Sequence, residues 1–131
     1  MQRSSEEISE LDVAKWETQL RKGSLGLAVL ASLWRGECYG LELLRHLEGT
    51  AGFTVPEGTI YPLLSRLKAA KLVDSSWVET EAGHPRKYFR LTADGRRYAR
   101  GIADSWFAFV GGMNKLLEPL EEKTRARYRA G

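Results

Sequence analysis

Cysteine and histidine, two common sources of nucleophiles, proton carriers and metal ligands, are scarce in this sequence, which has a single cysteine and two histidines. A lone cysteine, Cys38, excludes an intramolecular disulfide and fits a reducing compartment. Cys38 and His46 cannot close a tetrahedral metal shell, since they supply only two ligands and no second cysteine exists. The sequence also has no phosphate-binding loop and no nucleophile elbow. We therefore expect a protein that is not an enzyme and that uses no metal or other cofactor.

Long hydrophobic runs are absent as well. The longest nearly apolar segment, residues 25–34, is too short to span a bilayer. The N-terminus has no basic segment followed by an apolar one, so no secretory signal is recognised. We expect a soluble cytoplasmic protein that does not contact membranes.

The length and the charge distribution point to one small domain with an anionic partner. The 131 residues, 43% of them hydrophobic, suffice for one compact domain with flanking helices. A net charge of +3 is only mildly basic, but the basic side chains gather in residues 66–100, whereas residues 1–20 are mainly acidic. The positive charge therefore lies in and directly behind the segment 56–73.

The segment 56–73, PEGTIYPLLSRLKAAKLV, predicts an amphipathic helix. Its apolar positions recur at helical spacing and are predicted to face the core: Ile60, Leu63, Leu64, Leu67 and Ala70. The opposite face is small and hydrogen-bonding, which suits entry into a DNA major groove about 12 Å wide. An ordinary surface helix is the alternative. Pro62 favours a helix that begins near Thr59 or one that bends, because proline removes a backbone donor.

Three helices are predicted before this segment begins. The first runs from about residue 6 to a stop at Gly23. Ser24 can cap a second, central helix over residues 25–34, and a third helix follows over residues 41–49 after a turn. The third helix and the segment 56–73 then form a helix-turn-helix.

Beyond Val73 the hydrophobic period changes from 3.6 to 2, which predicts a β-hairpin. Its strands are expected over residues 74–80 and 86–91, joined by a turn over residues 81–85. Because an isolated hairpin is only marginally stable, it must pack on the helices through Trp77, Phe89 or Leu91. Helices followed by such a wing make a winged helix-turn-helix, so the predicted fold is mainly α with a small β-hairpin.

A long C-terminal helix, capped by Thr92, is predicted to pair two copies of the chain. One of its sides is too apolar to be buried by the small domain alone, and Trp16 and Leu20 of the first helix would support the same isologous homodimer. The side chains assigned to the dimer core, or to an effector pocket within it, are Trp106, Phe107, Phe109, Met113, Leu116 and Leu120. The expected organisation is an N-terminal dimer-support helix (1–22), a DNA-binding domain (23–92) and a dimerisation helix with its tail (93–131).

Two runs of residues, VPEGTIYPLLSRLKAAKLV and GHPRKYFRLTADGRR, resemble the PadR-like transcriptional regulators. The family pattern has a Gly-Thr-Leu-Tyr-Pro core, a Gly-x-Pro-Arg-Lys-Tyr-Tyr wing and Leu-Thr-x-x-Gly. Residues 23–25 and 39–43 also match. Pro56 and Glu57 replace the usual Ser-Pro, which removes the serine cap of the helix. The resemblance, to the short subfamily with one C-terminal helix, implies a dimeric repressor that binds double-stranded DNA at an inverted repeat.

The candidate DNA-binding side chains lie on the helix of residues 56–73, on the wing and at two helix starts. They are Thr59, Tyr61, Ser65, Arg66, Lys68, His84, Arg86, Lys87, Ser24 and Tyr39. Arg66 or Arg86 is the better candidate for bidentate guanine contacts, whereas hydroxyls and lysines suit phosphates. Tyr61 could instead support the helix, and Ser24 and Tyr39 could serve as caps or packing residues.

The aromatic cluster of the last helix has two readings. In some relatives such a cluster lines a pocket between subunits for small apolar or aromatic effectors, as the resemblance implies; a filled dimer core is the alternative.

For the whole chain, the alternative function is a winged-helix module that binds protein without sequence-specific DNA binding.

Overall fold

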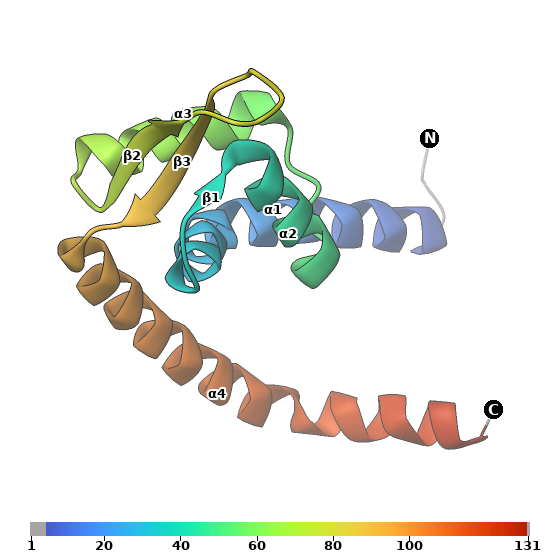
Figure 1. Cartoon of the computed structure of the whole chain (residues 1–131). Helices are drawn as coiled ribbons and strands as arrows, with labels where there is room; N and C mark the ends of the chain where they lie inside the picture. Colours follow the sequence, from blue (N-terminus) through green and yellow to red (C-terminus); the bar gives the residue numbers. More distant parts are fainter. Residues whose placement is uncertain (1–4, 131) are drawn as a thin grey trace. The chain divides into compact units, whose positions relative to one another are not determined.

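The computed structural model describes the backbone of residues 5–130 and the side chains of residues 12–121 (Figure 1). In chain order its elements are α1 (Ser5–Trp34), β1 (Cys38–Tyr39), α2 (Gly40–Ala51), α3 (Glu57–Ala69), β2 (Val73–Val78), β3 (Arg86–Leu91) and α4 (Ala93–Ala130). The three strands form an antiparallel sheet in the order β1-β3-β2. The chain divides into two compact units, one up to Ala99 and one from Arg100 on. The predicted class, mainly α with a small β wing, is confirmed.

The core of the first unit lies where α1, α2, α3 and the sheet meet. The second half of α1 provides Val29, Leu30 and Leu33, each at most 1% exposed, as expected for a central helix. The remaining buried apolar side chains come from α2, α3, the hairpin and the start of α4: Leu43, Leu47, Ile60, Leu64, Val73, Phe89, Leu91 and Ala99. The core assignment of Ala70 was wrong: it is exposed, because α3 ends at Ala69 and Ala70 is its C-cap.

The predicted stop at Gly23 is wrong, because α1 continues unbroken to Trp34. A glycine that ends a helix commonly adopts a left-handed conformation, and Gly23 has no positive φ. Ser24 is therefore no N-cap; its hydroxyl donates to the Leu20 carbonyl at 2.8 Å inside the helix. An interior glycine costs only about 0.5–1 kcal/mol, which the helical segments on both sides offset. The expected boundary between residues 22 and 23 accordingly falls within a helix.

The start of α3 also differs from the prediction near Thr59, since the helix begins at Glu57 with Pro56 as N-cap. The carbonyl of Pro56 accepts hydrogen bonds from the N–H of Thr59 at 2.9 Å and of Ile60 at 3.2 Å. Pro62 thus lies inside the helix. Its missing N–H would have bonded the carbonyl of Gly58, an exposed residue of the first turn, where water can take its place. No side chain caps this N-terminus, as the loss of the usual serine predicts.

The predicted hairpin is confirmed, with β2 slightly displaced from residues 74–80. The pairs run from Val73 opposite Leu91 to Val78 opposite Arg86. A third strand was not predicted: the segment expected to be a turn contains β1, whose Cys38 and Tyr39 pair with Phe89 and Tyr88 of β3. A strand of two residues is too short to show a hydrophobic period.

The start of α4 is fixed to the connection between α3 and β2. The hydroxyl of Thr92 accepts from the N–H of Gly95 at 3.0 Å, which confirms the predicted cap, and donates to the carbonyl of Lys71 at 2.6 Å. The N–H of Thr92 binds the carbonyl of Leu72 at 3.1 Å. A Cβ atom on Gly95 would lie 2.9 Å from the carbonyl carbon of Leu72, and closer still to its oxygen. Glycine at residue 95 therefore permits this close approach.

Candidate nucleic-acid interface

The helix-turn-helix is formed by α2 and α3, with residues 52–56 between them. Gly52 ends α2 in the left-handed region, with φ of 68°. Its N–H binds the carbonyl of Glu48 at 3.1 Å, and the N–H of Phe53 binds the carbonyl of Leu47 at 3.3 Å. These bonds satisfy carbonyls that a helix end leaves open and turn the chain sharply into α3.

The outward face of α3 carries the predicted polar set. At 100° per residue, Ser65 lies near the centre of this face, with Tyr61 and Lys68 on one side of it. Arg66 and Thr59 lie further round the helix on the other side, at the edge of the face. All five are exposed, whereas Ile60 and Leu64 on the opposite side are 0% exposed. The amphipathic pattern therefore brings these five side chains to one accessible face.

Lys68 is engaged within the chain. Its ammonium donates to the Ser75 hydroxyl of β2 at 2.7 Å. The neighbouring Asp74 carboxylate accepts from the N–H of Ser75 at 2.9 Å and from Arg90 at 3.2 Å. The Ser75 N–H, followed by Arg90, lowers the pKa of Asp74 below its usual range. Lys68 thus ties α3 to the hairpin.

Tyr61 packs against the start of α2 while keeping 42% of its surface exposed. A Cβ atom on the buried Gly40 would lie 2.7 Å from Cζ and 2.8 Å from Cε1 of the Tyr61 ring. Carbon atoms in contact are normally about 3.5–4.0 Å apart, so a larger residue at position 40 would displace the outer end of the ring from this place. The supporting role considered for Tyr61 is consistent with this contact, although its exposed part still faces outward.

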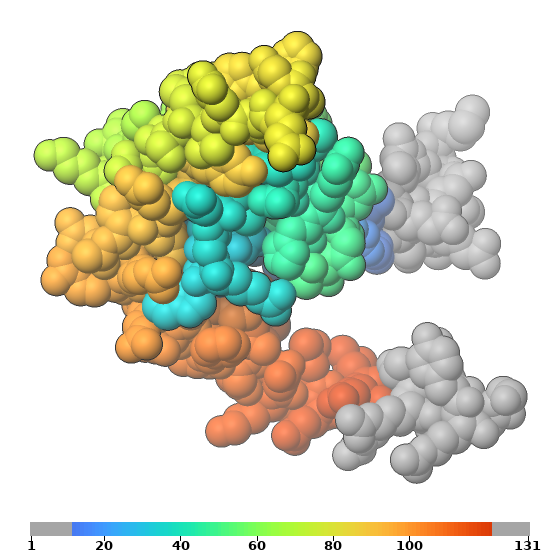
Figure 2. Space-filling model, in the orientation of Figure 1, coloured from blue at the N-terminus to red at the C-terminus, as the bar shows by residue number. Residues whose placement is uncertain are grey.

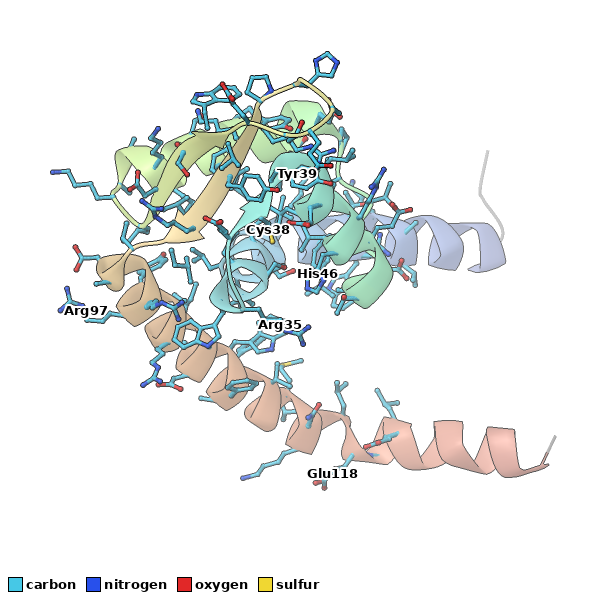
Figure 3. All side chains as sticks on the ribbon, in the orientation of Figure 1. Arg35, Cys38, Tyr39, His46, Arg97 and Glu118 are labelled. Carbon is cyan, nitrogen blue, oxygen red and sulfur yellow. The ribbon has the colours of Figure 1, made fainter. Side chains whose placement is uncertain are left out.

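Tyr39 and Arg86 are brought together by the pairing of β1 with β3. The guanidinium carbon of Arg86 lies 4.4 Å from the centroid of the Tyr39 ring. The rings of Tyr39 and Tyr88 meet edge to face, 5.5 Å apart at an angle of 66°. Tyr39 is the N-cap residue of α2 but makes no side-chain cap bond. Figure 3 labels it at the junction of β1 and α2.

Ser24, by contrast, was predicted to lie near a helix start, and this prediction is wrong. It lies in the interior of α1, and its hydroxyl donates to the Leu20 carbonyl at 2.8 Å. The amides of a helix N-terminus are therefore not available beside it.

The wing turn is closed by Thr80, whose hydroxyl donates to the carbonyl of His84 at 2.8 Å. His84 itself is exposed. The Lys87 ammonium lies 5.8 Å from the centroid of the Trp77 ring and 5.7 Å from that of Phe89. Of the side chains expected to anchor the wing, Phe89 and Leu91 are buried, whereas Trp77 is 68% exposed.

Together, α3 and the hairpin carry three cationic side chains that are not neutralised by an ion pair among the described residues. Figure 2 shows the yellow hairpin beside the green atoms of α3. Arg66, Arg86 and Lys87 make no ion pair with a carboxylate among the side chains described, whereas Arg90 is paired with Asp74. Such an arrangement can bind phosphates and present a guanidinium to base edges.

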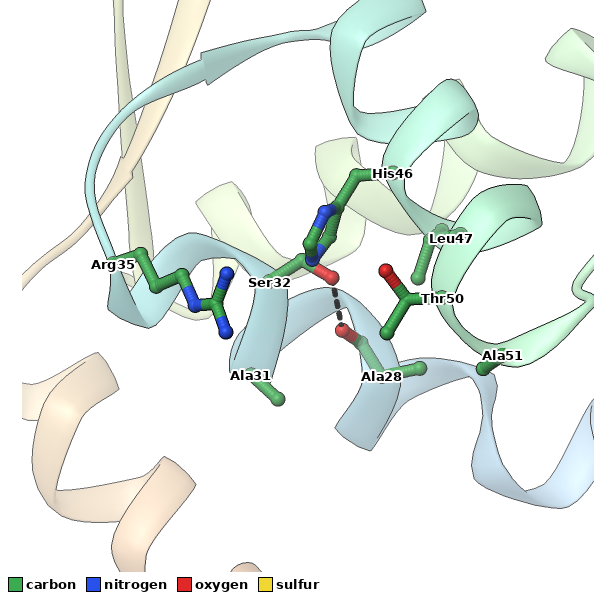
Figure 4. A pocket seen from close by; sticks show the side chains of 8 residues that line it. All are labelled: Ala28, Ala31, Ser32, Arg35, His46, Leu47, Thr50 and Ala51. Atoms are coloured by element: carbon green, nitrogen blue, oxygen red, sulfur yellow. Dashed lines mark hydrogen bonds between the residues drawn. The ribbon is translucent and has the colours of Figure 1, made fainter.

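A separate pocket lies between α1 and α2 (Figure 4). It is lined by Ala28, Ala31, Ser32, Arg35, His46, Leu47, Thr50 and Ala51. The hydroxyl of Ser32 is already bonded to the Ala28 carbonyl at 2.7 Å. None of the aromatic residues assigned to an effector pocket lines it.

The remaining candidates for ligand chemistry are few. Cys38 is half-buried, and its burial, followed by the carboxylates of Glu42 and Glu37, raises the pKa of the thiol. A raised pKa disfavours the reactive thiolate. Within the side chains of residues 12–121, no group of three or more His, Cys, Asp and Glu residues is arranged to hold a metal ion.

Apolar side chains remain exposed on α1 and on α4. On α4 the exposed fractions reach 69% for Phe107 and 75% for Leu116, and on α1 Trp16 is 60% exposed. The other members of the predicted dimer set are exposed as well: Leu20, Trp106, Phe109, Met113 and Leu120. In the described part of the chain, no helix is long and apolar enough to cross a membrane.

Sequence reasoning overlooked two members of this interface. Gly40 was noted only within the matching segment of residues 39–43, and Tyr88 only within the second strand of the hairpin, residues 86–91. Their roles depend on the packing of Tyr61 and of Tyr39, which come from other elements. The match at residues 39–43 was the one available signal.

Comparisons with known proteins agree with this geometry. The model of the Transcriptional regulator PadR-like family matches residues 29–101. A PadR family transcriptional regulator from Eggerthella lenta DSM 2243 superposes with a TM-score of 0.74 at 34% identity, over 85% of this chain and 96% of that one. A PadR-like transcriptional regulator from Bacillus cereus strain ATCC 14579 gives a TM-score of 0.70 at 33% identity, over 76% of this chain and 96% of that one.

An uncharacterized protein of Lysinibacillus sphaericus is 24% identical over 102 residues, which are 76% of this chain and 94% of that protein. The residues matched by the family model include both the helix-turn-helix and the wing. The chain belongs to the PadR-like family of transcriptional regulators.

Proposed function

We propose that this protein is a transcriptional repressor that binds an inverted repeat in double-stranded DNA as a homodimer. The observation that carries the proposal is the polar outward face of α3 beside a hairpin with unpaired cations, in a family of transcriptional regulators. In this arrangement α3 enters the major groove and the wing follows the adjacent backbone.

The side chains have different roles in the proposed complex. Arg66 reads a guanine with two hydrogen bonds, because its fork matches the O6 and N7 acceptors. Thr59 and Ser65 supply short hydroxyl donors from the same face of α3. His84 and Lys87 contact the phosphate backbone from the wing, which fixes orientation without reading sequence.

The proposed dimer uses the exposed apolar side chains of α4, with those of α1 in support. Exposure of each apolar side chain to water is unfavourable, and a two-fold axis lets the apolar patch of one subunit pack against the same patch of the other. Two recognition helices held by such a dimer read half-sites one turn apart, about 34 Å. The substitution Phe107→Glu places a charge in this contact and should yield monomers in light scattering, while Lys15→Glu on exposed α1 should not.

The proposed repressor is released from DNA when a small, flat, apolar effector binds between the two subunits. Trp106, Phe107 and Phe109 provide rings on which such a ligand can stack. Its binding would change the spacing of the two α3 helices. Operator affinity that stays unchanged at saturating ligand would exclude this mechanism.

The proposed function is tested by selecting genomic DNA fragments with the purified protein at low and at moderate salt. The expected result is an inverted repeat whose enrichment survives the salt increase. Arg21→Gln, which removes one charge from α1, should leave the selected repeat unchanged. Uniform binding that vanishes with salt would contradict the proposal and favour a protein-binding module.

A further inference from the structure

The outer face of the sheet places an arginine and two aromatic rings in one contact. Because side chains alternate along a strand, Arg86, Tyr88 and Arg90 of β3 project to the same side. Tyr39 of β1 is paired with Tyr88 and joins them there. The guanidinium of Arg86 lies over the Tyr39 ring at 4.4 Å, and Tyr88 meets that ring edge to face at 5.5 Å. A planar guanidinium at this distance is attracted to the negative face of the ring.

Arg90 shows how differently a neighbouring arginine on this face is held. It lies two residues further along β3, and Asp74 of β2 binds its guanidinium at 3.2 Å. Arg86 makes no such pair with a carboxylate among the described side chains. Stacking on Tyr39 therefore restrains Arg86 while leaving its charge and its N–H donors available.

We propose that Tyr39 is a positioning residue for DNA binding, whose ring holds the guanidinium of Arg86 in the orientation in which it meets a backbone phosphate. This inference rests on the proposed function. A free arginine loses side-chain freedom when it binds, and a stacked one has lost much of that freedom already. Tyr39 then contributes to affinity through its ring, and its hydroxyl need not contact the DNA.

Variants of Tyr39 separate these two contributions. Tyr39→Phe keeps the ring and should bind the selected operator within about twofold of the native protein, as the cation–π contact does not need the hydroxyl. Tyr39→Leu removes the ring and should weaken binding about two- to fivefold, the range expected for an exposed cation–π contact. Arg86→Gln should weaken binding at least as much.

The coupling between the two residues is measured with double variants. In a protein that already carries Arg86→Gln, Tyr39→Leu should not weaken DNA binding further, since the ring no longer has a guanidinium to position. In a protein that carries Arg90→Gln, the matched control on the same strand, Tyr39→Leu should weaken DNA binding as much as it does alone. A further loss of affinity when Tyr39→Leu is added to Arg86→Gln would overturn the proposal. So would a Tyr39→Phe loss as large as that of Tyr39→Leu, because it would assign the contact to the hydroxyl.

A measurement on the DNA-free protein keeps this inference separate from the proposed function. Protons on the Arg86 side chain that lie over the Tyr39 ring should show upfield NMR shifts, retained in Tyr39→Phe. Unshifted Arg86 protons in the native protein would overturn the inference even if DNA is bound and even if Tyr39→Leu fails to fold. If the shift is present but no DNA is bound, the proposed function fails, and with it the positioning role.

Discussion

Gly40→Ala tests the contact that links the two helices of the helix-turn-helix. The new Cβ would lie 2.7 Å from Cζ of Tyr61 and 2.8 Å from Cε1, roughly 1 Å inside normal carbon contact. The atoms it meets are the outer end of a ring that is 42% exposed and can turn toward solvent, so the cost lies toward the lower end of the about 1–3 kcal/mol for forcing a methyl group into filled space. Part of this is offset because alanine loses less backbone freedom than glycine in a helix. We expect a net destabilisation of about 1 kcal/mol or less.

The assay is urea unfolding followed by circular dichroism at one fixed protein concentration, since the proposed dimerisation would contribute to stability. Gly49→Ala is a matched control in the same helix, because a Cβ there meets nothing within 4 Å. This control should stabilise the protein by about 0.5–1 kcal/mol. The two glycines therefore predict opposite signs for the same substitution.

The cause of the stability loss in Gly40→Ala is tested by repeating the substitution in a protein that carries Tyr61→Ala. Removing the ring leaves room for the methyl group, so Gly40→Ala should then cost little or become stabilising. An unchanged cost in this background would refute the account of Gly40, as would a Gly40→Ala protein as stable as Gly49→Ala.

Two further predictions concern stability. Gly95→Ala forces a Cβ against the Leu72 carbonyl, which is backbone and cannot rotate away, so urea unfolding should show a loss of at least about 2 kcal/mol; a loss below that of Gly40→Ala would contradict this reading. Asp74 has a lowered pKa, chiefly from the N–H of Ser75 and then from Arg90, so its carboxylate stabilises the fold above the ordinary pKa of 3.8, an advantage lost as the pH falls through the lower folded value. The excess stability over Asp74→Asn should therefore be present at neutral pH and disappear in acid; a pH-independent difference in urea midpoint would contradict this assignment.

The helix-turn-helix and the wing could be predicted because their signals are local. The 3.6-residue period places Ile60 and Leu64 on one face of α3, and the change to period 2 marks the hairpin. Both faces of α3 and both hairpin strands are confirmed. The DNA-binding roles of the side chains remain predictions, because they depend on a partner outside the chain.

Other features could not be predicted because they depend on tertiary contacts. Gly23 looks like a helix stop, and only its backbone conformation distinguishes it from a C-cap glycine. Strand β1 exists through its pairing with β3 and is too short to show a period. The stack of Arg86 on Tyr39 joins residues far apart in sequence. Each of these contacts becomes visible only when the elements are assembled.

The central claim is that α3 reads base sequence while the wing contacts the backbone. It is tested most directly by comparing the DNA selected by Arg66→Gln and by Lys87→Gln with that selected by the native protein. The account predicts that Arg66→Gln relaxes the preference at a particular base pair of each half-site, at a cost of about 1–3 kcal/mol for the native site. Lys87→Gln should weaken all sites alike and lower the salt dependence. An unchanged preference in Arg66→Gln, with both variants weakening every site equally, would contradict base reading by Arg66.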